Sequence, residues 1–169
     1  KKIEVITKDN KSETAEAATV ATSLASEGAN VVIGPATSGA SAASIPALTS
    51  AGVPMISPSG TQTNLVENDK GEVQEYFFRT TFTDGYQGEI MAKYATENFS
   101  AKKVVLYFDN SSDYGKGVAE AFKKAYTGEI VSEITFASGD KDFQAALTKL
   151  KDKEFDAIIM PGYYNETGT

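Results

Sequence analysis

Residues 31–41 read VVIGPATSGAS, a short apolar run that ends at a glycine and continues into small hydroxyl-bearing residues. Gly34 and Gly39 have the spacing of a phosphate-binding P-loop, but Ala40 occupies the position where that motif carries its lysine. A continuous apolar run before such a loop is typical of a buried strand in a parallel sheet. The stretch therefore predicts a strand followed by a binding loop, and the missing lysine favours a small carboxylate over a triphosphate.

Strand-like and helix-like patterns alternate on both sides of this loop. The expected strands are residues 2–7, 30–33, 53–56, 76–81, 103–108, 130–136 and 155–160. The expected helices follow apolar spacings of three and four residues around positions 17–24, 90–94, 118–125 and 143–150. A further helix is expected before Gly52, where Pro46 implies a kink or a late start. This alternation predicts an α/β protein with parallel sheets flanked by helices.

The chain also contains an approximate internal repeat. Ile6-Thr7 precedes Gly34 by the same distance as Ile134-Thr135 precedes Gly162, with an Ala-rich helix and an apolar strand between each pair. Two duplicated units are typical of two similar lobes, although unrelated βαβ units also share a length. We expect a first Rossmann-like lobe at residues 1–82 and a second at residues 83–169.

Composition excludes several classes of function. The 169-residue chain has no Cys and no His, which rules out a thiolate nucleophile, a Ser-His-Asp triad and most transition-metal sites. The formal charge of −7 argues against nucleic acid as a partner. No apolar stretch approaches the roughly 18 residues of a membrane span. We therefore expect a binding protein with no cofactor and no metal rather than an enzyme.

The candidate site lies at the carboxyl ends of the strands, where open parallel sheets bind ligands. Small hydroxyl-bearing residues follow two neighbouring strands. These residues are Thr37, Ser38 and Ser41 after the first of them, and Ser57, Ser59 and Thr61 after the second. Adjacent glycines such as Gly60 let backbone N–H groups approach a ligand closely. The structural alternative is that each hydroxyl only caps a helix.

The second lobe offers aromatic side chains at the corresponding positions. Tyr114 opens an expected helix, and Tyr163 follows the last expected strand. A tyrosine at a strand end can close over a ligand and donate its hydroxyl hydrogen, whereas the alternative is ordinary packing at the lobe surface. Tyr164 alternates away from Tyr163 and is expected to point elsewhere. Asp109 and Asp113 are the carboxylates that an enzyme would use, but both also fit loop turns and caps.

Taken together, the motifs resemble the extracellular ligand-binding receptors of bacterial ABC transporters for branched-chain amino acids, with the type I periplasmic-binding fold. The resembling stretches follow one another along the chain in the order of that family. They are Val32-Ile33-Gly34, Thr37-Ser38, Gly52-Val53-Pro54-Met55-Ile56-Ser57-Pro58, Phe78-Arg79-Thr80, Asp84, Gln87-Gly88, Asp113-Tyr114-Gly115, Lys141-Asp142-Phe143 and Gly162-Tyr163.

The resemblance implies a solute-binding component that captures a small amino acid between two lobes and delivers it to a membrane permease. It implies that Ser38 and the turn Ser59-Gly60-Thr61 hold the α-carboxylate, and that Thr61 also helps to hold the α-ammonium. It further implies that Tyr114 and Tyr163 close over the ligand. The expected location is outside the cytoplasm, in the periplasm or as a cell-surface lipoprotein.

Family members have a strand and a helix before the segment KKIEVIT, and they continue past Gly168 to an acidic residue that pairs with the ammonium. The resemblance therefore implies an internal part of a longer protein, incomplete at both ends. Apolar sheet surface left uncovered would favour association of the chain. Two alternatives stay open: a sensor domain of the same fold for amides, short peptides or other small carboxylates, and a carboxylate-based hydrolase.

Overall fold

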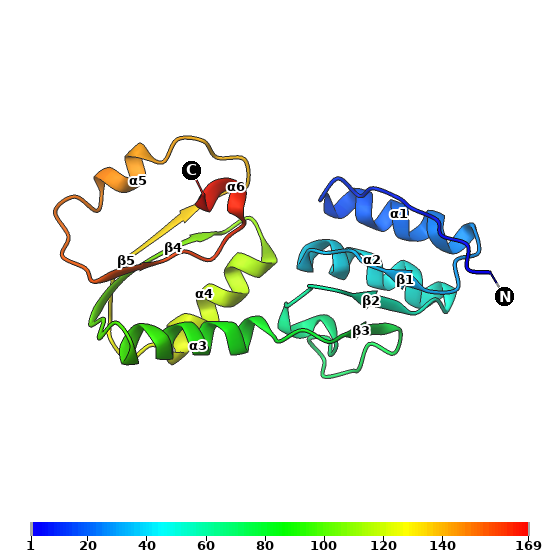
Figure 1. Cartoon of the computed structure of the whole chain (residues 1–169), viewed down its shortest axis with the longest axis horizontal. Coiled ribbons are helices and arrows are strands. Elements are labelled where there is room, and N and C mark those ends of the chain that lie inside the picture. The colour runs from blue at the N-terminus through cyan, green and yellow to red at the C-terminus, as the bar shows by residue number, and fades with distance from the viewer. Residues whose placement is uncertain (1, 169) are drawn as a thin grey trace. The chain divides into compact units, whose positions relative to one another are not determined.

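Two three-stranded parallel sheets organise the chain, as the alternation of strands and helices predicts. The computed structural model describes residues 2–168 and divides into two compact units, Lys1–Phe82 and Thr83–Thr169, each built on one sheet (Figure 1). The α/β class is confirmed. The role of the two units as ligand-binding lobes stays a prediction.

The first unit has the strand order β1-β2-β3. Its elements are α1 (Thr14–Ser26), β1 (Val32–Ile33), α2 (Ser38–Ala51), β2 (Met55–Ser57), a 3₁₀ helix η1 (Thr63–Leu65) and β3 (Phe77–Arg79). The helix α2 connects β1 to β2, which gives the βαβ crossover that a parallel pair requires.

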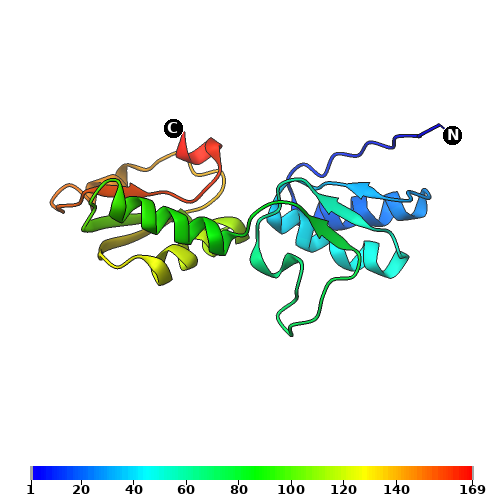
Figure 2. The ribbon, with the colours of Figure 1, turned by 60° about the horizontal axis from the view of Figure 1, so that its bottom comes forward.

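Both helices of this unit lie on the same face of its sheet (Figure 2). Residues paired across the three strands therefore alternate between a covered and an open face. The row Val32, Met55 and Phe77 faces the helices and joins a core with Ala21, Ile45, Leu48, Val53 and Leu65. The neighbouring row Ile33, Ile56 and Phe78 lies on the open face, with exposed fractions of 78%, 40% and 52%. This row, Ile33, Ile56 and Phe78, is called the open-face row below.

The expected strand at residues 2–7 does not form, and the prediction is wrong. This segment is extended and exposed, and β1 is an edge strand of the described sheet. Alternating apolar side chains do not make a strand without a neighbour, because the backbone N–H and C=O groups need a ladder of hydrogen bonds. The first half of the internal repeat therefore has its helix and second strand but lacks its first strand.

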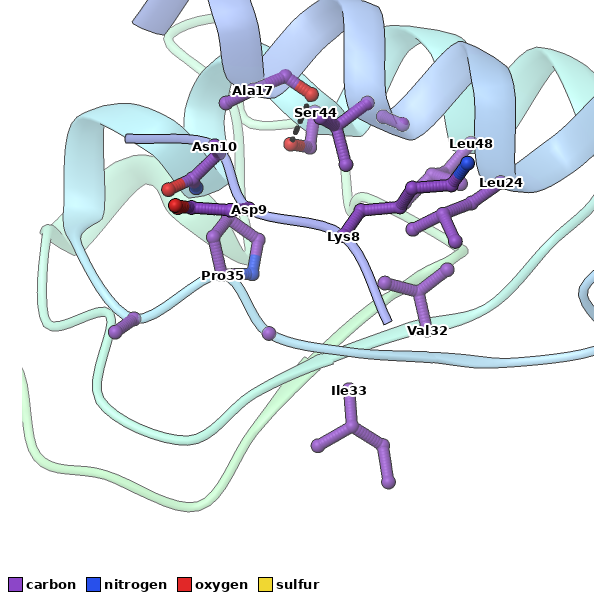
Figure 3. Close-up of a pocket in the computed structure, with 14 residues that line it drawn as sticks. Lys8, Asp9, Asn10, Ala17, Leu24, Val32, Ile33, Pro35, Ser44 and Leu48 are labelled. Atoms are coloured by element: carbon purple, nitrogen blue, oxygen red, sulfur yellow. Dashed lines mark hydrogen bonds between the residues drawn. The ribbon is translucent and has the colours of Figure 1, made fainter. Parts of the chain in front are cut away.

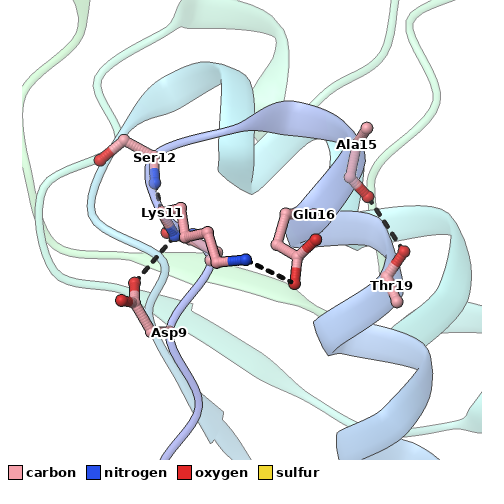
Figure 4. Close-up of polar contacts among 7 residues, drawn as sticks. Asp9, Lys11, Ser12, Ala15, Glu16 and Thr19 are labelled. Atoms are coloured by element: carbon pink, nitrogen blue, oxygen red, sulfur yellow. Dashed lines mark hydrogen bonds and ion pairs between the residues drawn. The ribbon is translucent and has the colours of Figure 1, made fainter.

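A polar turn joins this segment to α1 (Figure 4). Asp9 Oδ1 accepts a hydrogen bond from the backbone N–H of Lys11 at 2.8 Å, and Asn10 Oδ1 accepts one from Ser12 at 3.0 Å. Lys11 and Ser12 both have positive φ angles, of 53° and 59°. The two side-chain acceptors hold this left-handed backbone, which is unfavourable for residues with a Cβ.

Helix α2 begins at Ser38 and continues through Pro46, so of the two alternatives expected from this proline, a kink or a late start, the late start is wrong. Proline removes one backbone hydrogen bond from a helix interior. Pro46 lies on the exposed side of α2, whereas the face that includes Ala40, Ser44 and Leu48 is buried against α1 and the sheet. Burial of that face offsets the lost hydrogen bond.

The second unit has the strand order β5-β4-β6. Its elements are α3 (Asp84–Glu97), β4 (Lys103–Asp109), α4 (Asp113–Ala125), β5 (Glu129–Phe136), α5 (Gln144–Thr148), β6 (Ala157–Ile159) and α6 (Tyr164–Thr167). The central strand β4 is buried on both faces. Val104, Leu106 and Phe108 pack against α3 and α4, whereas Val105 and Tyr107 join a second core with Phe136 and Leu150.

Helix α3 forms where expected, and its buried face consists mainly of small residues. Ile90 and Tyr94 are exposed by 43% and 54%, whereas Gly88, Ala92 and Ala95 are buried. Small residues face α4 because they let the two helix backbones approach closely. Helix α5 is also shorter than the expected 143–150, since it ends at Thr148.

Candidate ligand-binding site

Ser38 is the first residue of α2, and its buried side chain ties that helix to the loop after β2. Its hydroxyl oxygen accepts hydrogen bonds from the backbone N–H groups of Thr61 and Gln62, both at 3.2 Å. Ser38 and Thr61, which the sequence assigns to one site in the first lobe, are therefore adjacent. The Ser38 hydroxyl hydrogen and the Thr61 hydroxyl have no hydrogen-bond partner recorded among residues 2–168.

Other hydroxyls of this region join the two loops to each other. Ser57 Oγ accepts from the backbone N–H of Gly60 at 2.9 Å and donates to the carbonyl of Pro35 at 3.0 Å. Ser41 Oγ lies 3.2 Å from Ser57 Oγ. These bonds give Ser41 and Ser57 a structural role in joining the two loops, which differs from the helix capping that the sequence left open as the alternative.

Ser59 has the same kind of partner. Its hydroxyl donates to the carbonyl of Ala36 at 2.7 Å, which joins the loop after β2 to the loop after β1. Ser59 is exposed at this position. The bond orders the turn that carries Thr61, and a ligand contact by Ser59 itself stays a prediction.

Gly60 sits where no larger residue fits. A Cβ at this position would lie 2.8 Å from Ser57 Oγ and 3.1 Å from a Leu65 methyl carbon. The Gly60 carbonyl accepts hydrogen bonds from Arg79 Nη1 at 3.1 Å and from Thr81 Oγ1 at 3.2 Å. Arg79 also donates to the carbonyls of Gln62 and Thr63. The sequence did not predict that the Arg79 guanidinium holds this loop. The residue was noted only as part of the Phe78-Arg79-Thr80 motif.

The first turn of α2 offers unoccupied donors next to these hydroxyls. Within residues 2–168, no acceptor is recorded for the backbone N–H groups of Ser38, Gly39 and Ala40, and the Thr37 side chain does not cap the helix. Free N–H groups and the helix dipole at such an end favour an anion. Ala40, at the lysine position of a P-loop, is buried with an exposed fraction of 1%. The arrangement suits one carboxylate group.

The two tyrosines expected in the second lobe lie against each other. Tyr114 is in the first turn of α4, Tyr163 follows β6, and their ring centroids are 5.4 Å apart in a stacked arrangement. Gln87 Nε2 of α3 donates a hydrogen bond to the Tyr114 hydroxyl at 2.9 Å. Tyr164 is 83% exposed, as its alternation from Tyr163 predicts. Gln87 was not among the predicted site residues, because its partner is 27 positions away.

The Tyr163 hydroxyl is strongly held in its neutral form. Burial is the largest cause, followed by electrostatic interaction with Tyr114 and then with the carboxylates of Asp109, Asp84 and Asp113, and together they raise the pKa of Tyr163 to about 12. A phenol with this pKa keeps its hydrogen at neutral pH. It is therefore available as a hydrogen-bond donor.

The two carboxylates that an enzyme would use have structural partners. Asp109 Oδ1 accepts from the backbone N–H and the hydroxyl of Ser111, at 2.8 and 2.6 Å, in a turn at the end of β4. Asp113 forms an ion pair with Lys116 one helical turn away at 3.0 Å. Asp109 Oδ2 is buried without a recorded hydrogen bond among the described residues. Asp109 thus fits the turn interpretation, whereas the cap of α4 is Ser112 and Asp113 is engaged with Lys116; these contacts do not favour an acid–base pair.

A cavity of about 200 Å³ lies in the first unit between residues 8–10, α1 and the loop after β1 (Figure 3). Its walls include Leu24, Val32 and Leu48. Lys8 is paired with Glu27 at 2.6 Å, and the Ser44 hydroxyl donates to backbone carbonyls of α1 and α2. The cavity is therefore mainly apolar, and several of its polar groups are already bonded within the chain.

A second cavity, of about 330 Å³, lies in the other unit beside α5. Tyr107, Phe136 and Met160 contribute aromatic and apolar walls, and Glu166 lies at its edge, where its carboxylate accepts from the backbone N–H of Gly139 at 2.8 Å. None of the six residues predicted as ligand contacts lines either cavity.

Residues 2–168 contain no group of three or more acidic side chains placed to hold a metal ion. None of the helices described is long and apolar enough to cross a membrane.

Comparison with known proteins identifies the class to which this fold and these loops belong. A family model described as periplasmic binding protein matches residues 1–167. The chain is 34% identical over 163 residues to a Leu/Ile/Val-binding protein homolog of Brucella melitensis, and the match covers 95% of this chain and 43% of the relative.

Solved structures give the same result. The substrate-binding protein LivJ of a branched-chain amino acid transporter from Streptococcus pneumoniae, in complex with isoleucine, is 58% identical with a TM-score of 0.91, and the match covers 98% of this chain and 46% of that one. A solute-binding protein of an ABC transporter from Rhodopseudomonas palustris, in complex with 3,4-dihydroxybenzoic acid, is 28% identical with a TM-score of 0.83, over 99% of this chain and 48% of that one.

The chain belongs to the periplasmic binding protein family, whose members are solute-binding proteins of ABC transporters and not enzymes. The family that the sequence motifs predict is thereby confirmed. The chain spans less than half of the length of the relatives it matches.

Proposed function

We propose that this chain is part of the solute-binding component of an ABC transporter that binds a small branched-chain amino acid between two lobes. Ser38, Ser59, Gly60 and Thr61 form the first half of the site, and Tyr114 and Tyr163 close over the ligand from the second lobe. The protein performs no chemistry on the ligand, and closure of the lobes is the mechanism of capture.

The observation that carries this proposal is the free first turn of α2. Its three unpaired N–H groups lie beside the Ser38 hydroxyl, and the Ser38 oxygen is held by the backbone of Thr61 and Gln62. Such a site can satisfy a carboxylate without a positively charged side chain. A branched-chain amino acid is favoured because the LivJ structure, 58% identical to this chain, contains isoleucine.

A second candidate is a small carboxylate that is not an amino acid. The structure from Rhodopseudomonas palustris contains an aromatic acid and has nearly the same fold over 99% of this chain. A carboxylate on α2 suits both ligands, because the two share that group. The two functions are then distinguished by the groups of the ligand other than its carboxylate. A sensor domain for such acids, amides or short peptides would use the same loops.

The test uses the full-length protein that contains this chain. We expect L-leucine, L-isoleucine or L-valine to raise its melting temperature in a thermal-shift titration, and isothermal titration calorimetry to give one site per molecule. Isovalerate, which lacks the ammonium group, and leucinamide, which lacks the carboxylate, are the matched controls. Stabilisation by benzoates alone would favour the second candidate, and no response to any of these compounds would overturn the proposal.

We also propose an exported protein, in the periplasm or anchored at the cell surface, that delivers its ligand to a membrane permease. The family name supports this location, and the transporters named for the similar solved structures support this partner. In isolation, the chain is expected to associate through the open-face row, since exposed apolar surface favours contact with other protein surface.

A further inference from the structure

The Tyr114 hydroxyl is held from a different helix. Gln87 is the fourth residue of α3, Tyr114 lies in the first turn of α4, and the Gln87 amide nitrogen is 2.9 Å from the Tyr114 oxygen. Both side chains are half-buried. The hydrogen bond therefore joins the N-terminal ends of two helices that are far apart in sequence.

Close packing of the two helices fixes the distance across which this bond forms. A Cβ on Gly88, the residue after Gln87, would lie 2.5 Å from Ala121 Cβ and 2.6 Å from the backbone nitrogen of Phe122. A Cβ on Gly117 would lie 2.5 Å from a carboxylate oxygen of Asp84. Each helix thus contributes a glycine at a point of contact, and α3 cannot shift along α4 without a clash.

The ring of Tyr114 has a second restraint, the ring of Tyr163. Tyr163 stacks on the Tyr114 ring with an angle of 26° between the planes. The Tyr114 ring is therefore restrained on its face, and its hydroxyl is restrained by Gln87. A side chain held in this way loses little conformational entropy when it meets a ligand.

The direction of the hydrogen bond determines what the Tyr114 hydroxyl can still do. An amide N–H only donates, so the bond from Gln87 Nε2 uses a lone pair of the tyrosine oxygen and leaves its single hydrogen free. We propose that Gln87 is a positioning residue that commits the Tyr114 hydroxyl to donate its hydrogen to an acceptor atom of the ligand. This inference rests on the proposed function, because it takes Tyr114 as a ligand contact.

A double-mutant cycle in the full-length protein tests this role, with L-leucine, L-isoleucine and L-valine as probes in calorimetry. Gln87→Met keeps the length of the side chain and removes the donor. We expect it to lower affinity about threefold to tenfold, the effect of one hydrogen bond. In a Tyr114→Phe background, the same change should have no further effect. Gln144→Met, at an exposed position of α5, is the matched control and should leave affinity unchanged.

A second variant reverses the hydrogen bond. Gln87→Glu has nearly the same shape, but its carboxylate accepts the tyrosine hydrogen and turns a lone pair of Tyr114 towards the ligand. Affinity should fall further than in Gln87→Met. If the reversed hydrogen bond causes the extra loss of affinity, this loss should disappear in the Tyr114→Phe background. If the carboxylate introduced by Gln87→Glu instead repelled the ligand directly, the extra loss would remain in that background.

The outcomes separate this inference from the function on which it rests. If the unmodified protein binds any of the three amino acids but the effects of Gln87→Met and Tyr114→Phe add, Gln87 acts through the fold and the inference is overturned alone. Unchanged affinity in Tyr114→Phe overturns it as well. If the unmodified protein binds none of the three amino acids, the proposed function and this inference both fail.

Discussion

The side-chain oxygen of Ser38 lies 3.2 Å from the backbone nitrogen of Thr61, so the first residue of α2 accepts a hydrogen bond from the loop after β2. Ser38→Ala removes this acceptor and leaves the N–H groups of Thr61 and Gln62 without it. Unsatisfied buried donors cost about 1–3 kcal/mol each. We therefore expect Ser38→Ala to lower the free energy of unfolding by about 1–3 kcal/mol and to weaken amino-acid binding.

Chemical denaturation and calorimetry of the full-length protein measure both effects. Ser50→Ala, an exposed position on the same helix, is the control and should change the free energy of unfolding by less than about 0.5 kcal/mol. Equal stabilities and affinities for the Ser38 and Ser50 variants would contradict a role for this hydroxyl.

A second prediction concerns the contact between α3 and α4. Gly88→Ala places a methyl group 2.5 Å from Ala121 Cβ and 2.6 Å from the backbone nitrogen of Phe122. Overpacking of this kind costs about 1–3 kcal/mol, more than the ~1 kcal/mol that alanine gains over glycine in a helix. The melting temperature should therefore fall. Glu89→Ala, at the exposed next position, should leave it nearly unchanged, and a Gly88 variant at least as stable as the unmodified protein would contradict this packing.

A third prediction concerns the isolated 169-residue chain. The open-face row should drive self-association, and Phe78→Lys should shift the chain towards a monomer because a charge is costly to bury between sheets. Light scattering coupled to size-exclusion chromatography measures the change. Val73→Lys replaces a residue that is 67% exposed outside the sheet and serves as the control. A monomeric unmodified chain with a cooperative melting transition would argue against this association.

A fourth prediction concerns alkaline pH. The pKa of Tyr163 is raised from 10.0 to about 12, mainly by burial, so the folded state binds this proton more tightly than the unfolded state. The stability that this group contributes is fully present below pH 10 and is lost as pH rises through about 12. In a spectroscopic titration of tyrosinate, Tyr163→Phe should remove one phenol that ionises near pH 12. An unchanged titration in that range would show that this phenol is not buried.

Local patterns predicted the elements best where local and tertiary preferences agree. The continuous apolar run of β4 is a strand because Val104 and Val105 are buried on opposite faces of one sheet. Residues 2–7 have an equally regular pattern and form no strand, since no neighbouring strand supplies a ladder within the described residues. On α3, the large side chains of Ile90 and Tyr94 are exposed, because the close approach at Gly88 selects small side chains for the face against α4.

For the candidate site, too, the sequence predicted some features and only the structure gave the others. The hydroxyl-rich loops and the tyrosines were identified from residue type and position after expected strands. The hydrogen-bond partners of those residues were not. Arg79 and Gln87 reach the site residues from another strand and another helix, and no local pattern announces a contact between positions 19 or 27 residues apart.

By itself, the sequence determined the α/β class, the parallel sheets, the family and the type of chemistry that the loops can offer. These properties depend on which side chains are present and on short periodic patterns, which the chain carries locally. Only the tertiary structure decided which hydroxyls are occupied in joining loops, which N–H groups of α2 stay free, and which partner orients Tyr114. These outcomes depend on close contacts between segments that are distant in sequence, because a hydrogen bond forms only when packing brings donor and acceptor within about 3 Å.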